Sequence, residues 1–299
     1  MIQIYDDVSL SDKTSFKTGG AARYYVQPST VDEIIESIAW ADSRKEPVLI
    51  IGKGTNILVS DNGWPGLVID AGAQFDAITW NEGRAMCNSG AALNRLIREM
   101  IDRRLCGLEH LSGIPGSIGG AVVMNAGSYG HSVSECIKSV DFYDYAEKRI
   151  NTLPIEQLEA GYRRTVFHKK KVFVLSCNFC FKSDANGSAE DVFKECIAKR
   201  KEKHPLDLPN CGSIFKNING IGSAASLIEK CGLKGLREGN VEVSRKHANF
   251  MVNLGQGTTD DVRRLIVQVQ KTVYEKQGVL LEPEVIFAGE FGEKLFVPK

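Results

Sequence analysis

The sequence predicts an α+β fold in more than one domain. With 299 residues the chain is too long for one small core, so two or three domains are expected. Short β-rich segments alternate with a few amphipathic helical patterns. The strand at 48–51 runs into a glycine turn at 52–56, but the residues before the next strand are too short and too broken for the crossover helix of a doubly wound sheet. We therefore do not expect a Rossmann-type fold.

The composition is that of an ordinary globular chain. Lys and Arg total 37, as do Asp and Glu, so the net charge is zero. Nucleic acid or a membrane surface would usually require a basic excess, and neither partner is expected. The first residues lack the features of a signal peptide, and no apolar run approaches the ~18 residues that span a bilayer. We expect a cytoplasmic protein and a monomer.

The eight cysteines should be mostly free thiols in such a compartment. Cys177 and Cys180 form the only C-x-x-C pair. They lie in a strand-like segment, where residues three apart face opposite sides, and no second pair completes a zinc site. We therefore expect no metal site.

The remaining elements follow from hydrophobic periodicity and from start and stop signals. A long helix should begin at Thr258 or Thr259 and end at Gly278, and residues 161–167 stay undecided between loop and strand. Other helices are predicted at about 31–43, 92–104, 189–202 and 223–231, and strands within 15–26, 48–51, 66–71, 77–80, 84–90, 139–145, 149–153, 171–182, 241–244, 248–253 and 280–289.

The stretch 111–130 contains six glycines, one proline and almost no charge. Such density usually marks unusual backbone angles or a close approach of the backbone. Many backbone N–H groups and few carboxylates suit an anion, most often a phosphate, whereas a buried, tightly turned loop is the alternative. The turn at 52–56 matches neither the Walker A nor the Rossmann pattern, and we interpret it as a second, independent anion-binding loop.

Six strings stand in unbroken order over about residues 10–290: 52–56, 113–120 with 125–130, 162–163, 212–217, 246–250 and 282–285. Together they resemble one family, the UDP-N-acetylenolpyruvoylglucosamine reductases (MurB). The chain resembles the shorter class of that family, without an obvious substrate-capping insertion. Thr165 and Ile218 depart mildly from the family pattern, which commonly has serine and proline there.

The resemblance implies an FAD-binding fold of the vanillyl-alcohol oxidase type at 1–204, in two subdomains of about 1–66 and 67–204, and a substrate-binding domain at 205–299. It implies that NADPH reduces FAD and that the flavin then passes hydride to C3 of UDP-N-acetylglucosamine enolpyruvate, giving UDP-N-acetylmuramate for peptidoglycan synthesis. The implied FAD-binding residues are Gly52, Lys53, Gly54, Thr55, Asn56, Ile57, Gly113, Ile114, Pro115, Gly116, Ser117, Gly119, Gly120, Ala121, Asn125, Ala126 and Gly127.

Three residues carry the implied catalysis. Hydride addition leaves negative charge on C2 and on the carboxylate, and a cation there stabilises the developing enolate more than the ground state; by resemblance it is Arg163. Ser213 would protonate C2 as general acid, with Cys211 a less favoured donor. Glu284, placed in the last strand opposite Val285, would act beside Arg163 in steering the enolate and its protonation.

Each of these residues also has an ordinary structural interpretation. Arg163 resembles a strand-edge arginine in a surface ion pair, with Arg164 on the opposite face. Ser213 resembles a turn serine bonded to nearby backbone, and Glu282 shares the face of Glu284. Two other functions stay open: a flavin enzyme with another substrate, such as an alcohol oxidase, and a binding module without catalysis.

Substrate contacts are implied for five residues, of which Lys216 and Asn217 would bind the nucleotide sugar. Tyr129, Lys203 and also Arg200 are weaker candidates, and a solvated helix face is the favoured explanation of the basic run that contains Arg200. His247 is interpreted as structural. The five implied residues are Tyr129, Tyr162, Lys203, Lys216 and Asn217.

Overall fold

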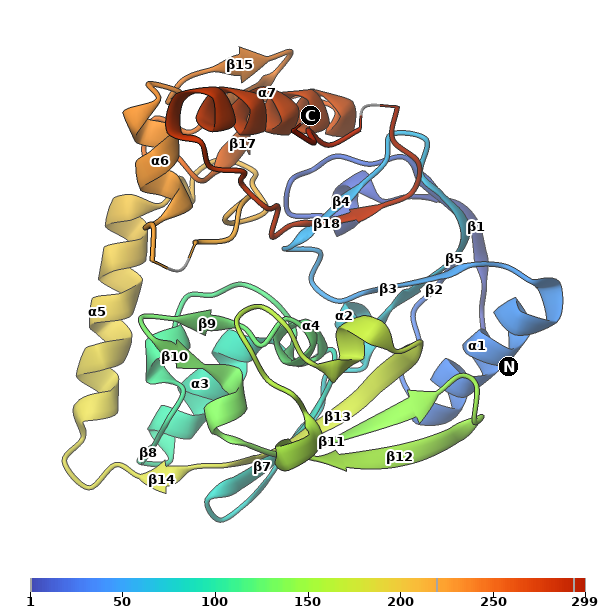
Figure 1. Cartoon of the computed structure of the whole chain (residues 1–299). Helices are drawn as coiled ribbons and strands as arrows, with labels where there is room; N and C mark the ends of the chain where they lie inside the picture. The colour runs from blue at the N-terminus through green and yellow to red at the C-terminus, as the bar shows by residue number, and fades with distance from the viewer. Residues whose placement is uncertain (1, 219, 293, 299) are drawn as a thin grey trace. The chain divides into compact units, whose positions relative to one another are not determined.

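The computed structural model describes residues 2–218, 220–292 and 294–298 (Figure 1). The chain forms two compact units. The first comprises Met1–Tyr5, Tyr25–Lys53 and Leu67–Arg200, and the second Asp6–Tyr24, Gly54–Gly66 and Lys201–Lys299. These units are defined by compactness alone, so the proposed functional domains 1–204 and 205–299 stay a prediction.

The first unit is built on a five-stranded antiparallel sheet in the order β12-β11-β13-β7-β6. Figure 1 shows the helices α3 (Leu93–Asp102) and α4 (Ile118–Val123) along one face of it. The predicted strands are all present, with bounds close to those expected. They are β6 (Ile78–Asn81), β7 (Arg84–Asn88), β11 (Ile137–Asp144), β12 (Arg149–Pro154) and β13 (Val172–Cys180).

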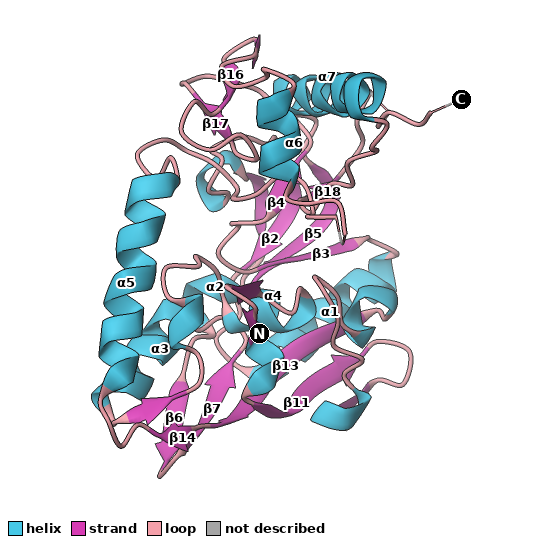
Figure 2. Ribbon diagram, turned by 60° about the vertical axis from the view of Figure 1, so that its left-hand side comes forward, coloured by secondary structure: helices cyan, strands magenta, loops and turns pink. Residues whose placement is uncertain are grey.

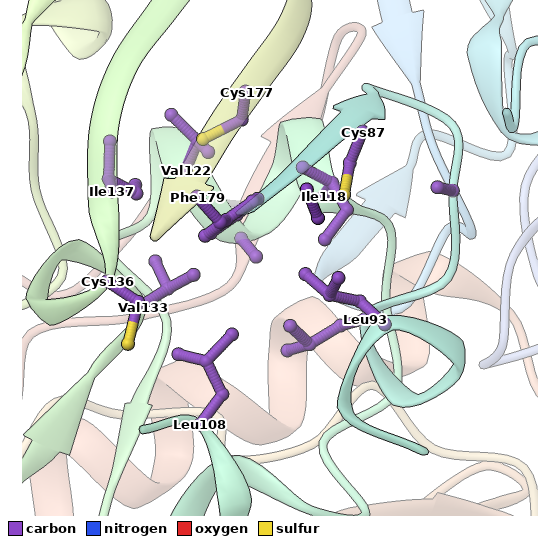
Figure 3. Close-up of a cluster of buried hydrophobic side chains, with 14 of the residues drawn as sticks. Cys87, Leu93, Leu108, Ile118, Val122, Val133, Cys136, Ile137, Cys177 and Phe179 are labelled. Carbon is purple, nitrogen blue, oxygen red and sulfur yellow. The ribbon is translucent and has the colours of Figure 1, made fainter. Parts of the chain in front are cut away.

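The core of the first unit lies between this sheet and the two helices. The buried face of α3 is the predicted one, Leu93, Leu96, Ile97, Met100 and Ile101, which repeats at helical spacing. Cys177 on β13 lies opposite Cys87 on β7, and Figure 3 shows both among Ile118, Val122 and Phe179. Cys177 is buried while Cys180 is partly exposed, as expected for opposite faces of a strand, and all eight cysteines are free.

A second sheet has the order β1-β2-β5-β3, and the division into units passes through its strands. Its β3 (Val48–Ile51) and β5 (Trp64–Asp70) are parallel without a helix between them, in agreement with the rejection of a Rossmann fold. Asp70 accepts hydrogen bonds from the N–H of Gly72 and from the Tyr25 hydroxyl, and so caps the short helix α2 (Ala71–Gln74). The other strands are β1 (Tyr5–Ser9) and β2 (Ala21–Val26).

The smaller elements complete this half of the chain. The helix α1 (Val31–Arg44) is capped by Thr30, and both α1 and α5 (Ser188–Lys203) agree with the predicted ranges. The helix α4, which begins inside the glycine-rich stretch 111–130, is not among the predicted helices. The short strands are β8 (Leu105–Cys106), β9 (Gly127–Ser128), β10 (His131–Ser132) and β14 (Lys182–Ser183), and the 3₁₀ helices are η1 (Ser11–Lys13), η2 (Glu109–Leu111), η3 (Val133–Glu135), η4 (Ile155–Gln157) and η5 (Val166–Lys169).

The second unit packs helices α6 (Ala224–Lys230) and α7 (Thr259–Gln277) with a three-stranded antiparallel sheet, and Figure 2 shows α7 beside β16 and β17. The apolar face of α7 is fully buried, and the helix begins and ends as predicted, with a Thr258–Asp261 capping box and a left-handed Gly278. The strands are β15 (Arg237–Glu238), β16 (Val241–Val243), β17 (Met251–Asn253), and β18 (Ile286–Ala288) parallel to β4 (Ile57–Val59).

The closing strand is shorter than predicted, because only Ile286–Ala288 pair regularly and Glu284 lies just before them. Residues 161–167, which the sequence leaves undecided between loop and strand, form a turn followed by the start of η5. Arg163 and Arg164 therefore do not lie on opposite faces of a strand.

Candidate active site

The two glycine loops predicted to bind an anion meet within the first unit. A Cβ on Gly52 would overlap the hydroxyl of Ser117, so only glycine allows this approach. Behind Gly52, a Cβ on Gly72 would lie 2.5 Å from the Gly52 carbonyl oxygen, and Lys53 Nζ donates to the Gly72 carbonyl at 2.5 Å. Gly52 is thereby packed against Ser117 of the second loop, whereas Lys53 is fixed to Gly72 in α2.

The second loop is held by the segment that leads into α3. Leu93 donates its N–H to the Gly116 carbonyl, and Gly119 donates its N–H to the Ser89 carbonyl. The Asn94 side chain accepts from the Gly113 N–H at 2.7 Å and donates to the Ile114 carbonyl at 2.9 Å. Gly113 has φ +80° and Gly116 φ +146°, angles that favour glycine.

The first turn of α4 departs from the expectation of free backbone amides. The N–H of Ile118 donates to the Ala91 carbonyl, that of Gly119 to Ser89, and that of Gly120 to the Ser117 hydroxyl. Glycine in this turn therefore serves close packing: a Cβ on Gly119 would lie 2.8 Å from the Ser89 Cβ.

The rest of the first loop belongs to the second unit. Gly54 has φ +63°, and a Cβ there would overlap the Lys13 carbonyl oxygen. The Gly54 carbonyl accepts from the Ser15 N–H at 2.9 Å. Asn56 donates its side-chain amide to the Glu284 carbonyl at 3.3 Å, and its own carbonyl accepts from the Ile286 N–H. Ile57 is buried at the start of β4.

Arg163 lies beside the second loop, in a tight turn closed by pairing of Gly161 with Arg164. It has φ +54°, a left-handed conformation that costs a non-glycine residue free energy. Asn125, which is buried, donates to the Gly161 carbonyl at 3.0 Å. A Cβ on Gly127 would lie 3.4 Å from an Arg163 guanidinium nitrogen. The turn thus places the guanidinium over the second loop.

Two further cations of the first unit gather near Tyr129. Lys199 Nζ and the Arg200 guanidinium lie 5.6 and 6.0 Å from the centre of its half-exposed ring. Arg200 also donates to the Ser112 carbonyl and the Ser128 hydroxyl, and its burial lowers the pKa of the guanidinium. Arg200 is therefore a partly buried, fixed cation, which the sequence could not distinguish from a solvated helix face.

Ser213 and Glu284 lie side by side in the second unit. Gly212 has φ +78° and Ser213 pairs with Phe250. The carbonyl of the next residue, Ile214, accepts a hydrogen bond from the Glu284 N–H at 2.7 Å. The alternative donor Cys211 is 1% exposed, and burial raises the pKa of its thiol to about 12, which argues against Cys211 as the donor.

The remaining predicted substrate residues are divided between the two units. Lys216 forms an ion pair with Glu282 at 2.5 Å. Glu282, the other glutamate predicted to share the face of Glu284, is therefore paired with a lysine. The Asn217 side-chain oxygen accepts from the Ala224 N–H at 3.1 Å. Lys203 is exposed at the end of α5. Tyr162 is half-exposed in the first unit, with its ring 5.0 Å from the Arg163 guanidinium carbon.

Comparison with known proteins identifies the family. A family model described as the FAD binding domain matches residues 22–152, and one described as the UDP-N-acetylenolpyruvoylglucosamine reductase C-terminal domain matches 204–288. The UDP-N-acetylenolpyruvoylglucosamine reductase of Caldicellulosiruptor saccharolyticus is 39% identical over 99% of this chain and 95% of its own length. The chain belongs to the UDP-N-acetylenolpyruvoylglucosamine reductase (MurB) family.

Other MurB proteins agree over nearly the whole chain. The reductase of Clostridium botulinum (strain Alaska E43) is 38% identical over 96% of this chain and 94% of its own length. The crystal structure of MurB from Thermus caldophilus matches with a TM-score of 0.81 and 30% identity, covering 97% of this chain and 99% of that one. The predicted resemblance and the α+β fold with an FAD-binding domain are thereby confirmed.

The MurB family uses FAD and NADPH, which confirms the predicted cofactors. The geometry of the described residues also fits FAD. The two glycine loops approach each other so closely that a side chain at Gly52 would collide with Ser117, and the cations Arg163, Lys199 and Arg200 lie beside the second loop. No helix among the described residues is long and apolar enough to cross a membrane. The individual site residues stay predictions.

Proposed function

We propose that this chain catalyses the NADPH-dependent reduction of UDP-N-acetylglucosamine enolpyruvate to UDP-N-acetylmuramate. The observation that carries the proposal is the MurB match over nearly the full length, which includes the C-terminal domain as well as the FAD-binding domain. That C-terminal match favours the reductase over an alcohol oxidase with the same flavin domain. The proposed location is the cytoplasm, and the proposed state is a monomer.

When bound, FAD supplies the hydride chemistry that links NADPH to the enolpyruvyl group. The predicted loop residues 52–57, 113–117, 119–121 and 125–127 would hold it. The Asn125 side chain already binds the Arg163 turn, so we assign its contribution to backbone and shape.

The protein's own residues manage the charge and the proton. The Arg163 guanidinium would bind the substrate carboxylate and stabilise the negative charge that develops on it. The Ser213 hydroxyl would donate a proton to C2, while the Glu284 carboxylate would orient the enolate and its protonation. The hydrogen bond from the Glu284 N–H to the Ile214 carbonyl supports joint action of Ser213 and Glu284, because it ties together the segments that carry them.

Substrate binding is assigned to the polar and aromatic side chains around these groups. Tyr129 and Tyr162 present half-exposed rings beside cations, which suits a nucleotide. Arg200 joins them as a fixed cation for a phosphate oxygen. Lys203, Lys216 and Asn217 would bind the nucleotide sugar from the second unit.

The experiment is to separate the two half-reactions in Ser213→Ala. Anaerobic NADPH should reduce the bound flavin at the wild-type rate, whereas reoxidation by the UDP-sugar should slow by at least ~100-fold, because general acid catalysis is typically worth that much. Ser226→Ala, an exposed serine of α6, is the matched control. NADPH oxidation that does not depend on the UDP-sugar would contradict the proposed reaction. Normal reoxidation in Ser213→Ala would remove Ser213 from its role.

A further inference from the structure

We propose that Asn249 is a positioning residue that holds Ser213 in place for protonation. The inference rests on the proposed function, because it gives Asn249 its role through Ser213. It accounts for the string 246–250, to which neither the resemblance nor the proposed chemistry assigned a task.

The side-chain amide of Asn249 binds both the N–H and the carbonyl of Phe215, two residues after Ser213. Its amide oxygen accepts from the Phe215 N–H at 3.0 Å, and its amide nitrogen donates to the Phe215 carbonyl at 2.8 Å. Its own carbonyl accepts from the Ile214 N–H at 2.9 Å. The residue is 4% exposed. A buried amide that lost these partners would cost free energy, so the arrangement is strongly determined.

These bonds matter for Ser213 because they restrain the chain that follows it, while a glycine precedes it. Gly212 has a left-handed backbone with no atom near the position of a Cβ, and its N–H donates to the Asn210 side chain at 3.0 Å, so one hydrogen bond restrains the chain on that side. On the other side, Ile214 and Phe215 are fixed between Asn249 and the segment that carries Glu284. Asn249 thus fixes the spacing between the serine and the glutamate.

His247 fixes Asn249 in turn. Its Nδ1 accepts from the Asn249 N–H at 3.3 Å, and its carbonyl accepts from the Phe250 N–H at 2.9 Å. Burial lowers the pKa of His247, which favours the neutral ring that such an acceptor requires. The string 246–250 is therefore a turn whose function is to present the Asn249 amide to the serine loop.

The test compares Asn249→Asp with Asn253→Asp in the FAD-loaded enzyme. Asn253 is a matched control: it is 3% exposed in the same unit and binds Phe16, Gly255 and Gly257, not the serine loop. We expect Asn249→Asp to slow reoxidation by the UDP-sugar ~10- to 100-fold, because a small misplacement of a reacting group has effects of this size. Flavin reduction by NADPH should stay within about twofold. An equal effect of Asn253→Asp, or equal slowing of both half-reactions, would overturn the inference.

A double variant distinguishes this inference from the proposed function. In a Ser213→Ala background, Asn249→Asp should cause no further slowing of reoxidation, since its effect acts through Ser213. A further slowing as large as in the wild type would overturn the positioning role. If Ser213→Ala alone leaves reoxidation unchanged, the proposed role of Ser213 has failed instead, and the inference with it.

Hydrogen exchange tests the same geometry without activity and without a variant. In the wild-type holoenzyme, the amides of Ile214 and Phe215 should exchange slowly, because Phe215 donates to the side chain of Asn249 and Ile214 to its main-chain carbonyl. In Asn249→Asp, exchange in the 211–217 segment should rise, whereas Asn253→Asp should leave it unchanged. Fast exchange of the Ile214 and Phe215 amides in the wild type would refute the proposed restraint even if Asn249→Asp fails to fold.

Discussion

Asparagine side chains hold three of the loops that carry the candidate site. Asn94 binds both sides of the Gly113–Ile114 peptide, Asn125 binds the turn that carries Arg163, and Asn249 binds Phe215. An amide both donates and accepts, so one side chain can satisfy a loop backbone that no strand pairs with. Preorganisation at the scale of single residues therefore depends on these amides as well as on the charged side chains of Lys53 and Arg200.

Arg163 is the residue on which the predicted charge stabilisation depends. Arg163→Lys should slow reoxidation by the UDP-sugar by ~100-fold or more, because an ammonium cannot replace the planar fork that binds a carboxylate at two points. The neighbouring Arg164 is exposed and offers a matched control, so Arg164→Lys should leave the rate within about twofold. Stopped-flow measurement of both half-reactions checks this. A larger loss in Arg164→Lys would reverse the assignment between the two arginines.

His247 should make stability depend on pH below neutrality. Its pKa is lowered in the folded protein by burial and by nearby Lys234, so the unfolded chain binds more protons once the pH falls below about 6.5. The free energy of unfolding should therefore decrease as the pH falls through that value toward the folded pKa. Urea titrations at pH 7.5 and 5.5 should show a smaller decrease in His247→Gln than in the wild type. An identical decrease in both would exclude this contribution.

At the scale of elements, capping and stop residues in the sequence correctly predicted where helices begin and end, because local interactions determine those positions. The bounds of α7 follow from Thr258, Asp261 and Gly278, which are all at its ends. The carboxylate of Asp61, however, also accepts from the N–H groups of Thr259 and Asp260, about 200 residues away in sequence, and no local pattern reveals that contact.

The candidate site shows the same limit. The glycine strings were visible in the sequence, but the turn at Arg163 and the contacts of Asn249 depend on partners that are distant along the chain. The resemblance supplied residue names without these contacts. Two signals pointed to Asn249, its place in the string 246–250 and its polar side chain within the predicted strand 248–253, and neither shows what the side chain binds.

The meeting of the two glycine loops makes a prediction at the same scale. In Gly52→Ala the new methyl group would overlap the Ser117 hydroxyl, so the loops must separate and FAD affinity should fall at least ~10-fold. Titration of apoprotein by flavin fluorescence measures this directly. Adding Ser117→Gly should restore part of the affinity, since it removes the atom that collides. Unchanged affinity in Gly52→Ala would show that this close approach does not shape the FAD site.

For the whole molecule, the order of the motifs along the chain predicted more than any one of them. Each string has an ordinary structural explanation, yet the FAD-binding and C-terminal family models match in the predicted order. Compactness groups residues 6–24 and 54–66 with the C-terminal half, a grouping that depends on tertiary contacts and that no sequence pattern indicated.

Flavin binding should be visible in the stability of the whole protein. A ligand that binds only the folded state adds about 2.7 kcal/mol at a concentration 100 times its Kd, which should raise Tm by about 5 °C or more. If the glycine loops bind the diphosphate, FAD should raise Tm most, FMN less and riboflavin least, because riboflavin has no phosphate for the loops to hold. Thermal unfolding of the apoprotein with each flavin measures the order, and Gly52→Ala should reduce the FAD shift. Equal shifts with riboflavin and FAD would mean that the isoalloxazine alone carries the binding, and the two loops would lose their assigned role.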